Sequence, residues 1–216
     1  KCSAASRAYI PASVWERIGS KYCAEVGKIT MGDVSDFSNY IGAVIDKKSF
    51  DNIAGYIDRA KADSGCTIVT GGNYDDSVGY FVEPTTILCE DPMYESMAQE
   101  IFGPVLSIHV YQDSEYENIL TICDSTSEYA LTGSIFAKYR EDIEFAKDAL
   151  RFSAGNFYIN DKPTGAVVGQ QPFGGARGSG TNDKAGSPLN LLRWVSPRSI
   201  KETFAPPKSW TYGFLE

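Results

Sequence analysis

Short extended runs and amphipathic helical segments alternate along most of this sequence, and that alternation restricts the folds open to it more than any other feature. Runs rich in β-branched and aromatic residues occupy 6–10, 66–72, 80–88, 104–111, 131–137 and 154–160. Helical patterns fill several of the intervening stretches, at about 13–26, 46–62, 114–124 and 140–152. Strands that alternate with helices predict an α/β fold, in which helices flank a mostly parallel sheet.

The helical segments carry their own start signals and apolar stripes. Two of them open on the Ser-x-x-Glu pattern of a capping box, Ser13 with Glu16 and Ser114 with Glu117. This pattern predicts that each serine caps its own helix. Within 46–62 one face collects the apolar side chains and should pack on the sheet. Its members are Phe50, Ile53, Ala54, Ile57 and Ala60.

Charge and residue content argue against several classes of partner. The 216 residues carry a net charge of −8 and no basic cluster, so nucleic acid is not an expected partner. No apolar run approaches the roughly 18–20 residues of a membrane span, so no membrane partner is expected. Five scattered cysteines and one histidine show no metal-ligand spacing, so no metal site is predicted, and His109 is expected to be a strand residue.

Three stretches carry reactive or ligand-binding side chains, although each alone also fits a structural role. Cys2 lacks a preceding base, and by itself it fits an inert thiol. Glu100 could accept hydrogen bonds from sugar hydroxyls and Phe102 could pack on a flat ring, or both could be ordinary helix-end and core residues. The glycine-rich stretch 170–180 matches neither common phosphate-loop spacing, but its amides could approach an anion closely.

Four blocks that occur in order favour the functional interpretation of these stretches. They are KCSAASR at 1–7, QEIFGPV at 99–105, GNFYIN at 155–160 and PFGGARGSG at 172–180. Together they resemble the catalytic domain of the NAD(P)-dependent aldehyde dehydrogenase superfamily. Further stretches, including VIDKKSFDNI and GGNYDDSVGYFVEPT, resemble its delta-1-pyrroline-5-carboxylate (glutamate-γ-semialdehyde) dehydrogenase branch, and this resemblance covers essentially the whole chain.

The resemblance implies a nucleophile and a cofactor site. Cys2 stands at the position of the catalytic cysteine, which attacks the aldehyde carbon before hydride passes to NAD. Glu100 falls at the position that binds the nicotinamide-ribose hydroxyls, and Phe102 would pack near the nicotinamide. The implied reaction of the full-length enzyme oxidises L-glutamate γ-semialdehyde to glutamate in proline catabolism, whereas the isolated chain is expected to be inactive.

The resemblance also implies a site for a small-molecule aldehyde that bears a carboxylate. The stretch Thr164-Gly165-Ala166 falls on an anchor loop whose backbone amides would hold the α-carboxylate, and Ser3 could donate to the same group. Phe173 resembles an aromatic wall beside the aliphatic part of the substrate. Some members of the branch carry serine where this chain has Ala166, and a lost hydroxyl contact would weaken binding by about 1 kcal/mol.

The expected domain organisation follows from the same resemblance. Residues 1–189 would form the catalytic domain from the nucleophile onward, and 190–216 would return to the rest of the subunit or to an oligomer interface, with exposed apolar surface. A strand is predicted at 197–204. Upstream sequence would supply an N-terminal dinucleotide-binding domain, the general base and an oxyanion-binding asparagine. The full-length enzyme would be a homodimer or larger, mitochondrial in eukaryotes and otherwise cytoplasmic.

Three alternatives remain open from the sequence. The substrate could be another acidic aldehyde, such as succinate semialdehyde. The chain could instead be a folded module without catalytic activity. Hydrolysis of thiol-reactive esters through Cys2 is the third interpretation.

Overall fold

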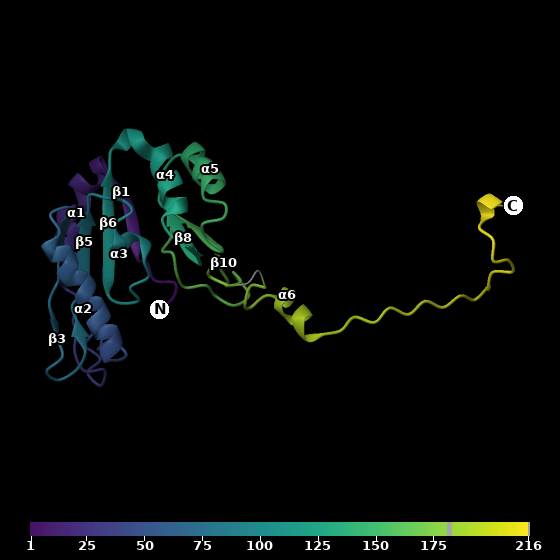
Figure 1. Cartoon of the computed structure of the whole chain (residues 1–216), viewed down its shortest axis with the longest axis horizontal. Coiled ribbons are helices and arrows are strands. Elements are labelled where there is room, and N and C mark those ends of the chain that lie inside the picture. Colours follow the sequence, from purple (N-terminus) through teal and green to yellow (C-terminus); the bar gives the residue numbers. More distant parts are fainter. Residues whose placement is uncertain (181–182, 216) are drawn as a thin grey trace.

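The structure is a computed structural model that describes residues 1–180 and 183–215, and a four-stranded sheet lies at its centre (Figure 1). The strands follow the order β1 (Arg7–Pro11), β6 (Val105–Tyr111), β5 (Thr85–Cys89) and β2 (Cys66–Thr70). Strand β6 pairs in parallel with β1 and β5, whereas β2 runs antiparallel to β5. The predicted mostly parallel sheet is therefore confirmed, with one antiparallel strand at its edge.

Helix α2 (Lys47–Ala62) covers one face of this sheet. The helix begins after Asp46, whose carboxylate accepts a hydrogen bond from the Ser49 N–H at 2.7 Å. All five side chains of the predicted apolar stripe are buried. Phe50, Ile53, Ile57 and Ala60 share one core cluster with Ile87 and Cys89 of β5 and with Met97 of α3 (Glu95–Ala98), so the stripe prediction is confirmed.

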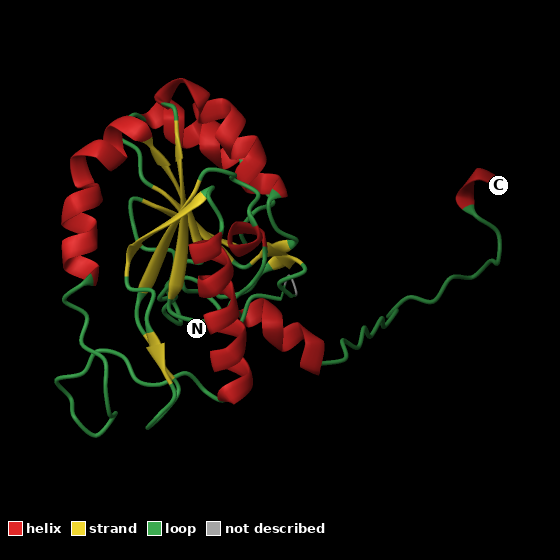
Figure 2. Ribbon diagram, turned by 60° about the vertical axis from the view of Figure 1, so that its left-hand side comes forward, coloured by secondary structure: helices red, strands yellow, loops and turns green. Residues whose placement is uncertain are grey.

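Helix α1 (Ala12–Val26) covers the opposite face of the sheet. The Tyr22 hydroxyl hydrogen-bonds to the buried Thr86 hydroxyl of β5 at 2.8 Å. Thr86 and its neighbour Ile87 point to opposite faces, because side chains alternate along a strand. Figure 2 shows the helices arranged around the outside of the strands, as the α/β prediction requires.

A second, smaller parallel pair joins β8 (Thr132–Ile135) to β9 (Asn156–Ile159). Helices α4 (Tyr116–Ser125) and α5 (Arg140–Ala149) pack on this pair through Leu120, Ala146 and Leu150. The remaining short elements are β3 (Tyr74–Asp75), β4 (Phe81–Val82), β7 (Tyr129–Ala130), β10 (Ala176–Arg177), α6 (Pro188–Leu191) and three 3-10 turns at Asp113–Glu115, Leu192–Trp194 and Gly213–Leu215. None of the helices in the described part of the chain is both long and apolar enough to cross a membrane.

Both predicted capping boxes are wrong. Neither α1 nor α4 has a cap from a side chain of its own first turn, and Ser114 lies in the 3-10 turn before α4. The Ser13 N–H instead donates to a carboxylate oxygen of Asp113 at 3.0 Å, and the Ser13 hydroxyl bonds to the other oxygen. A charged carboxylate accepts strongly at a helix N-terminus, so this acceptor from 100 residues away takes the place of the local one.

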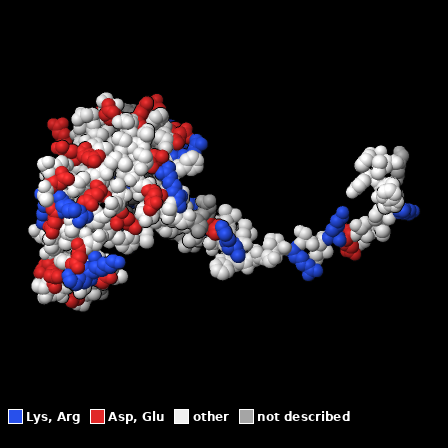
Figure 3. Space-filling view, viewed as in Figure 1, with Lys and Arg blue, Asp and Glu red and all other residues white. Residues whose placement is uncertain are grey.

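The residues that follow Trp194 leave the folded body as an extended segment (Figures 1 and 3). The strand predicted at 197–204 is wrong, because no strand in the described chain lies alongside to share its backbone hydrogen bonds. Large apolar side chains stay in solvent there, with Trp194 81%, Phe204 90% and Trp210 90% exposed. The predicted exposed apolar surface is thus confirmed.

The core around α2 yields a stability prediction. Replacing the fully buried Ile57 by alanine should lower the free energy of unfolding by about 2–5 kcal/mol, because the cavity left behind closes only partly. The matched control is Ile45→Ala, since Ile45 is 89% exposed and its truncation should change stability by no more than about 0.5 kcal/mol. Urea unfolding of the purified chain, followed by circular dichroism, measures both. Equal losses for the two variants would contradict the packing described.

Candidate active site

Cys2 and Glu100 lie far apart in sequence, but each lies shortly before the amino end of one of two adjacent parallel strands. The register pairs Arg7 of β1 with Ser107 of β6. The Ser107 N–H also donates to the Ser6 carbonyl at 3.1 Å, which continues the pairing toward Cys2. Because parallel strands run in the same direction, the segments that carry Cys2 and Glu100 both lie at the end of the sheet where these two strands begin.

The nucleophile candidate lies in a tight turn. The Ala4 N–H donates to the Lys1 carbonyl at 3.1 Å, and Cys2 and Ser3 form the two central positions of this turn. The Cys2 thiol is free and exposed. A small molecule can therefore reach its sulfur from solvent.

One hydroxyl contact connects this turn to the predicted anchor loop, and a second connects it to β8. The Ser3 and Thr164 hydroxyls lie 2.7 Å apart, and the Thr132 hydroxyl donates to the Ser3 carbonyl at 3.3 Å. Gly165 follows directly with φ at +90°, a conformation that strains residues with a side chain. The contact between Ser3 and Thr164, which are 161 residues apart in sequence, brings Ser3 next to the loop that carries Gly165 and Ala166, although Thr132 and the hydroxyl of Thr164 were not predicted to take part.

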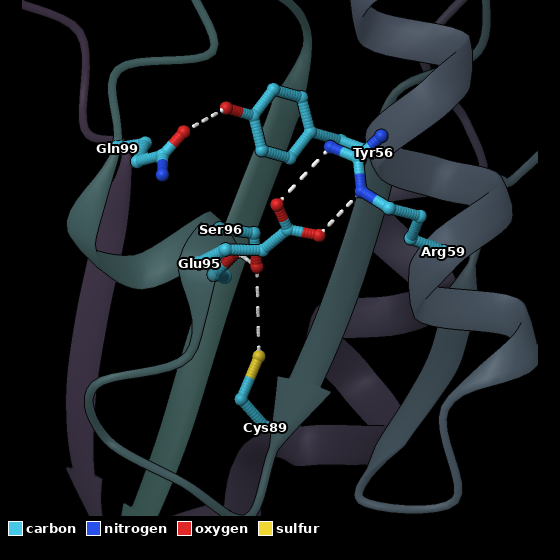
Figure 4. Close-up of polar contacts among 7 residues, drawn as sticks. Tyr56, Arg59, Cys89, Glu95, Ser96 and Gln99 are labelled. Atoms are coloured by element: carbon cyan, nitrogen blue, oxygen red, sulfur yellow. Dashed lines mark hydrogen bonds and ion pairs between the residues drawn. The ribbon is translucent and has the colours of Figure 1, made fainter.

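Helix α2 holds the segment that leads to Glu100 (Figure 4). The Tyr56 hydroxyl donates to the Gln99 side-chain oxygen at 2.5 Å. Arg59 donates to both carboxylate oxygens of Glu95, with Nε at 2.6 Å and Nη2 at 3.1 Å. A bidentate pair of this kind fixes orientation as well as distance. Both contacts anchor α3 to the core helix immediately before Glu100.

Glu100 and Phe102 are presented to solvent. The Glu100 side chain is exposed and forms no hydrogen bond or ion pair with other described residues. Phe102 has φ at +59° and a ring that is 58% exposed. The next residue, Gly103, approaches Ile53 so closely that an added Cβ would lie 2.5 Å from its terminal methyl. A free carboxylate beside an exposed aromatic ring fits a ligand with sugar hydroxyls and a flat ring.

Phe173 is held by its backbone neighbours. Its N–H donates to the Ala185 carbonyl at 2.8 Å, and the Ala185 N–H returns a hydrogen bond at 2.6 Å. The buried Asn156 side chain grips both flanking residues, donating to the Pro172 carbonyl at 2.8 Å and accepting from the Gly174 N–H at 3.1 Å. No hydrogen bond or ring contact among the described residues joins Phe173 to the Cys2 turn, so its place beside the substrate stays a prediction.

Asn156 and Gly155 begin the GNFYIN block, and both are needed for this packing. A Cβ on Gly155 would lie 1.9 Å from the Gly174 carbonyl oxygen, so only glycine allows the two segments to approach. The Lys184 ammonium donates to the carbonyls of Gly155 and Gly174 at 3.1 and 2.6 Å. An amide side chain and a lysine therefore fix the glycine-rich stretch around Phe173. Sequence reasoning missed Asn156, although a polar residue within a buried strand was a signal for it.

A hollow of about 490 Å³ lies near the end of α1, where residues including Glu25, Lys28, Thr30 and Tyr40 line it. None of the predicted site residues lines it. The described residues also hold no cluster of three or more histidine, cysteine or acidic side chains placed to bind a metal ion.

Known proteins resemble this chain closely over its whole length. Proteins named "Delta-1-pyrroline-5-carboxylate dehydrogenase, mitochondrial" from Dictyostelium discoideum and Homo sapiens are 61% and 50% identical over 215 and 217 residues. Each match covers 100% of this chain and 38% of the relative. The chain thus spans about two fifths of the length of these relatives.

Solved structures give the same result. The crystal structure of the Delta-pyrroline-5-carboxylate dehydrogenase from Mycobacterium tuberculosis has a TM-score of 0.89 and 56% identity, covering 100% of this chain and 40% of that one. The same enzyme bound with NAD has a TM-score of 0.88. The model of the "Aldehyde dehydrogenase family" matches residues 1–200. The chain therefore belongs to the aldehyde dehydrogenase family.

Proposed function

We propose that the full-length protein that carries this chain oxidises L-glutamate γ-semialdehyde to glutamate with NAD. The single observation that carries the proposal is the contact between the Ser3 and Thr164 hydroxyls, because it joins the Cys2 turn to the Gly165–Ala166 loop. An aldehyde-reactive thiol and an anion-holding loop are then neighbours. The names of the closely similar relatives and the NAD-bound structure support the same substrate and cofactor.

In this proposal Cys2 performs the covalent chemistry. Its thiolate attacks the aldehyde carbon, a carbon–sulfur bond forms, and the carbonyl oxygen takes the negative charge. NAD supplies the acceptor for the hydride that leaves this carbon. The oxygen re-forms its double bond as the hydride leaves, and the product is a thioester. Water then adds to the thioester, the carbon–sulfur bond breaks, and the acid departs as the Cys2 thiol is restored.

The Ser3 and Thr164 hydroxyls bind the substrate carboxylate together with the amides of Gly165 and Ala166. When two hydroxyls share one hydrogen bond, one of their two protons remains free for a third group. That free proton can be donated to an anionic acceptor such as a carboxylate. The loop amides supply further hydrogen-bond donors and need no counterion. The separation between Cys2 and this loop then sets which chain length between carboxylate and aldehyde fits the site. Phe173 would border the aliphatic part.

Glu100 and Phe102 form the cofactor contact in this proposal. The exposed Glu100 carboxylate accepts hydrogen bonds from the ribose hydroxyls, and the exposed Phe102 ring packs near the nicotinamide. The anchoring of α3 to α2 keeps both groups in place before the cofactor binds. Such preorganisation lowers the conformational entropy that binding would otherwise cost.

The larger assembly is part of the same proposal. Residues 1–189 act as the catalytic domain, and 190–216 contact the remainder of the subunit or a second copy in a homodimer or larger oligomer. The Trp194 and Phe204 side chains are exposed in this chain. Large apolar side chains in solvent are typical of a surface that another part of an assembly covers, which supports this position for the segment. The dinucleotide-binding domain belongs to the rest of the full-length protein. By the names of its relatives, the enzyme is mitochondrial if the source is eukaryotic.

The nucleophile is tested by replacing Cys2 with alanine in the full-length enzyme. NADH formation from pyrroline-5-carboxylate should fall to background, because no sulfur remains to form the thioester. Absorbance at the NADH band measures the rate, and thermal unfolding checks that the variant is folded. Cys23→Ala serves as the matched control and should keep its activity, since Cys23 lies in α1 away from the site. Retained turnover by the Cys2 variant would overturn the assignment.

The carboxylate site is tested at Thr164. Thr164→Val keeps the shape but removes the hydroxyl, so KM for glutamate semialdehyde should rise roughly fivefold, the effect of about 1 kcal/mol. KM for an uncharged aldehyde such as propanal should not change, and Thr164→Ser should restore wild-type behaviour. Assays with succinate semialdehyde beside glutamate semialdehyde compare the two acidic substrates. An equal rise of KM for propanal would show that Thr164 does not read the carboxylate.

Glu100→Gln tests the cofactor contact. KM for NAD should rise roughly five- to tenfold, because a neutral amide binds ribose hydroxyls less strongly than a carboxylate does. KM for the aldehyde should change less than about twofold, because the proposed site places Glu100 against the cofactor and not against the aldehyde. Steady-state kinetics with each substrate varied separately resolve the two effects, and Glu117→Gln on the exposed face of α4 is the matched control. An unchanged KM for NAD would reject the role of Glu100.

A further inference from the structure

Two cysteines that the proposed reaction does not use lie directly opposite each other on neighbouring strands. The antiparallel register of β2 and β5 pairs Cys66 with Cys89. Both side chains belong to the same apolar cluster beneath α2, so they point to the same face of the sheet. Both are free thiols. A pair of cysteines in register on one face is different from a lone buried thiol, because the two sulfurs can react with each other.

The backbone hydrogen bonds show which kind of antiparallel pair this is. The Glu90 N–H donates to the Gly65 carbonyl at 2.9 Å, and these residues flank the cysteine pair on one side. The Cys89 carbonyl faces away from β2, where it contacts Nδ1 of His109 at 3.0 Å. Cys66 and Cys89 therefore occupy a non-hydrogen-bonded position. Opposed residues there have Cα atoms about 4.5 Å apart, within the roughly 4.4–6.8 Å range that a disulfide spans.

The Cys89 sulfur lies beside a buried hydroxyl (Figure 4). Its Sγ lies 3.7 Å from the Ser96 hydroxyl of α3. The Ser107 hydroxyl of β6 donates to the Ser96 hydroxyl at 2.7 Å, which leaves the Ser96 proton free to point at the sulfur. Ser96 and Ser107 are 1% and 0% exposed. A chain of two hydroxyls can stabilise negative charge on Cys89 while that sulfur reacts.

Access differs between the two thiols and fixes the order of reaction. Cys66 is partly exposed at the start of the edge strand β2, whereas Cys89 is only 3% exposed. A reagent from solvent must therefore meet Cys66 first. Cys89 can then react with the Cys66 sulfur from its buried position between the sheet and α2.

From this geometry we infer that Cys66 and Cys89 form a modification site, a cross-strand dithiol that closes to a disulfide when it meets a low-molecular-weight disulfide such as oxidised glutathione. The Cys66 thiolate attacks one sulfur of the oxidant, whose S–S bond breaks and releases one thiolate. The Cys89 thiolate then attacks the Cys66 sulfur, the mixed disulfide breaks, and a second thiolate leaves. The protein loses two electrons and two protons, and the oxidant becomes two thiols.

The groups around the pair make the reaction pH-dependent. Burial raises the pKa of the Cys66 thiol, contacts with the Tyr94 hydroxyl and the Cys89 thiol offset part of that, and the Asp63 and Glu90 carboxylates raise it further. Burial also raises the pKa of Cys89 to about 12, with Ser96 and Ser107 opposing the rise and Cys66 adding to it. Both cysteines are thus protonated at neutral pH. The thiolate fraction, and with it the rate of closure, should increase about tenfold per pH unit between pH 7 and 9.

The test is oxidation of the purified full chain with oxidised glutathione, followed by acid quenching, alkylation of the remaining thiols and peptide mass spectrometry. A single Cys66–Cys89 disulfide is expected, closing about tenfold faster at pH 8 than at pH 7. Free Cys66 and Cys89 under conditions that modify the exposed Cys2 would overturn the inference. Disulfides scattered among all five cysteines, as an unfolded chain would give, would overturn it as well.

Matched variants separate the two steps. Cys89→Ser should stop the reaction at a glutathione adduct on Cys66, with at least about tenfold more adduct than in the wild-type chain, because no second thiol resolves it. Cys66→Ser should leave Cys89 unmodified, and Cys23→Ser should give the wild-type disulfide yield. A stable Cys66 adduct in the wild-type chain would show that Cys89 cannot reach it. This outcome is independent of the proposed enzymatic activity, since no step is read through NADH.

Discussion

The parallel pairing of β6 with both β1 and β5 is the constraint on which the remaining structure depends. Its residues Ser107 and Ile108 are 0% and 1% exposed, so the strand is covered on both faces. Because parallel strands cannot be joined by a short hairpin, the chain between them must form helices and loops that return to the same edge. Helices α1 and α2 cover opposite faces of the sheet, and the parallel register brings the segments before β1 and β6 together. The candidate active site is assembled by this pairing.

The residues proposed to contact the cofactor depend on the same core, because the backbone of one of them is strained. Phe102 is held at a positive φ, which costs a residue with a side chain roughly 1–3 kcal/mol, and Gly103 fits only because it lacks a Cβ beside Ile53. Such a conformation persists only where its surroundings fix it. Helix α2 supplies these surroundings, because its Ile53 packs against Gly103 and its Tyr56 hydroxyl donates a hydrogen bond to Gln99. The exposed ring and carboxylate thus lie in the loop after α3, and α2 holds that loop in place.

Local sequence patterns predicted what local energetics control. The stripe of α2, its start at Asp46 and the strand that contains His109 all follow from spacing within a few residues, and the structure confirms them. The cap of α1 could not be predicted in this way, because Asp113 lies 100 residues from Ser13 and no local pattern encodes it. The roles proposed for Cys2 and Glu100 rest on the resemblance of ordered blocks, because each residue alone also fits a structural role. The contacts of Thr132, Thr164 and Tyr56 needed the fold itself.

The fold places the cysteines of this chain in two kinds of surroundings, one exposed to solvent and the other buried. An aldehyde must reach sulfur from solvent, so a nucleophile belongs on a turn at the sheet edge, where Cys2 lies. An exposed thiol is also open to any oxidant that diffuses to it. Cys66 and Cys89 differ from Cys2 in two ways. Burial raises the pKa of both thiols and keeps them protonated, and the strand register places each opposite the other. The inferred oxidation of that pair would end in a disulfide that a thiol can reverse, and the reaction itself does not consume the Cys2 thiol.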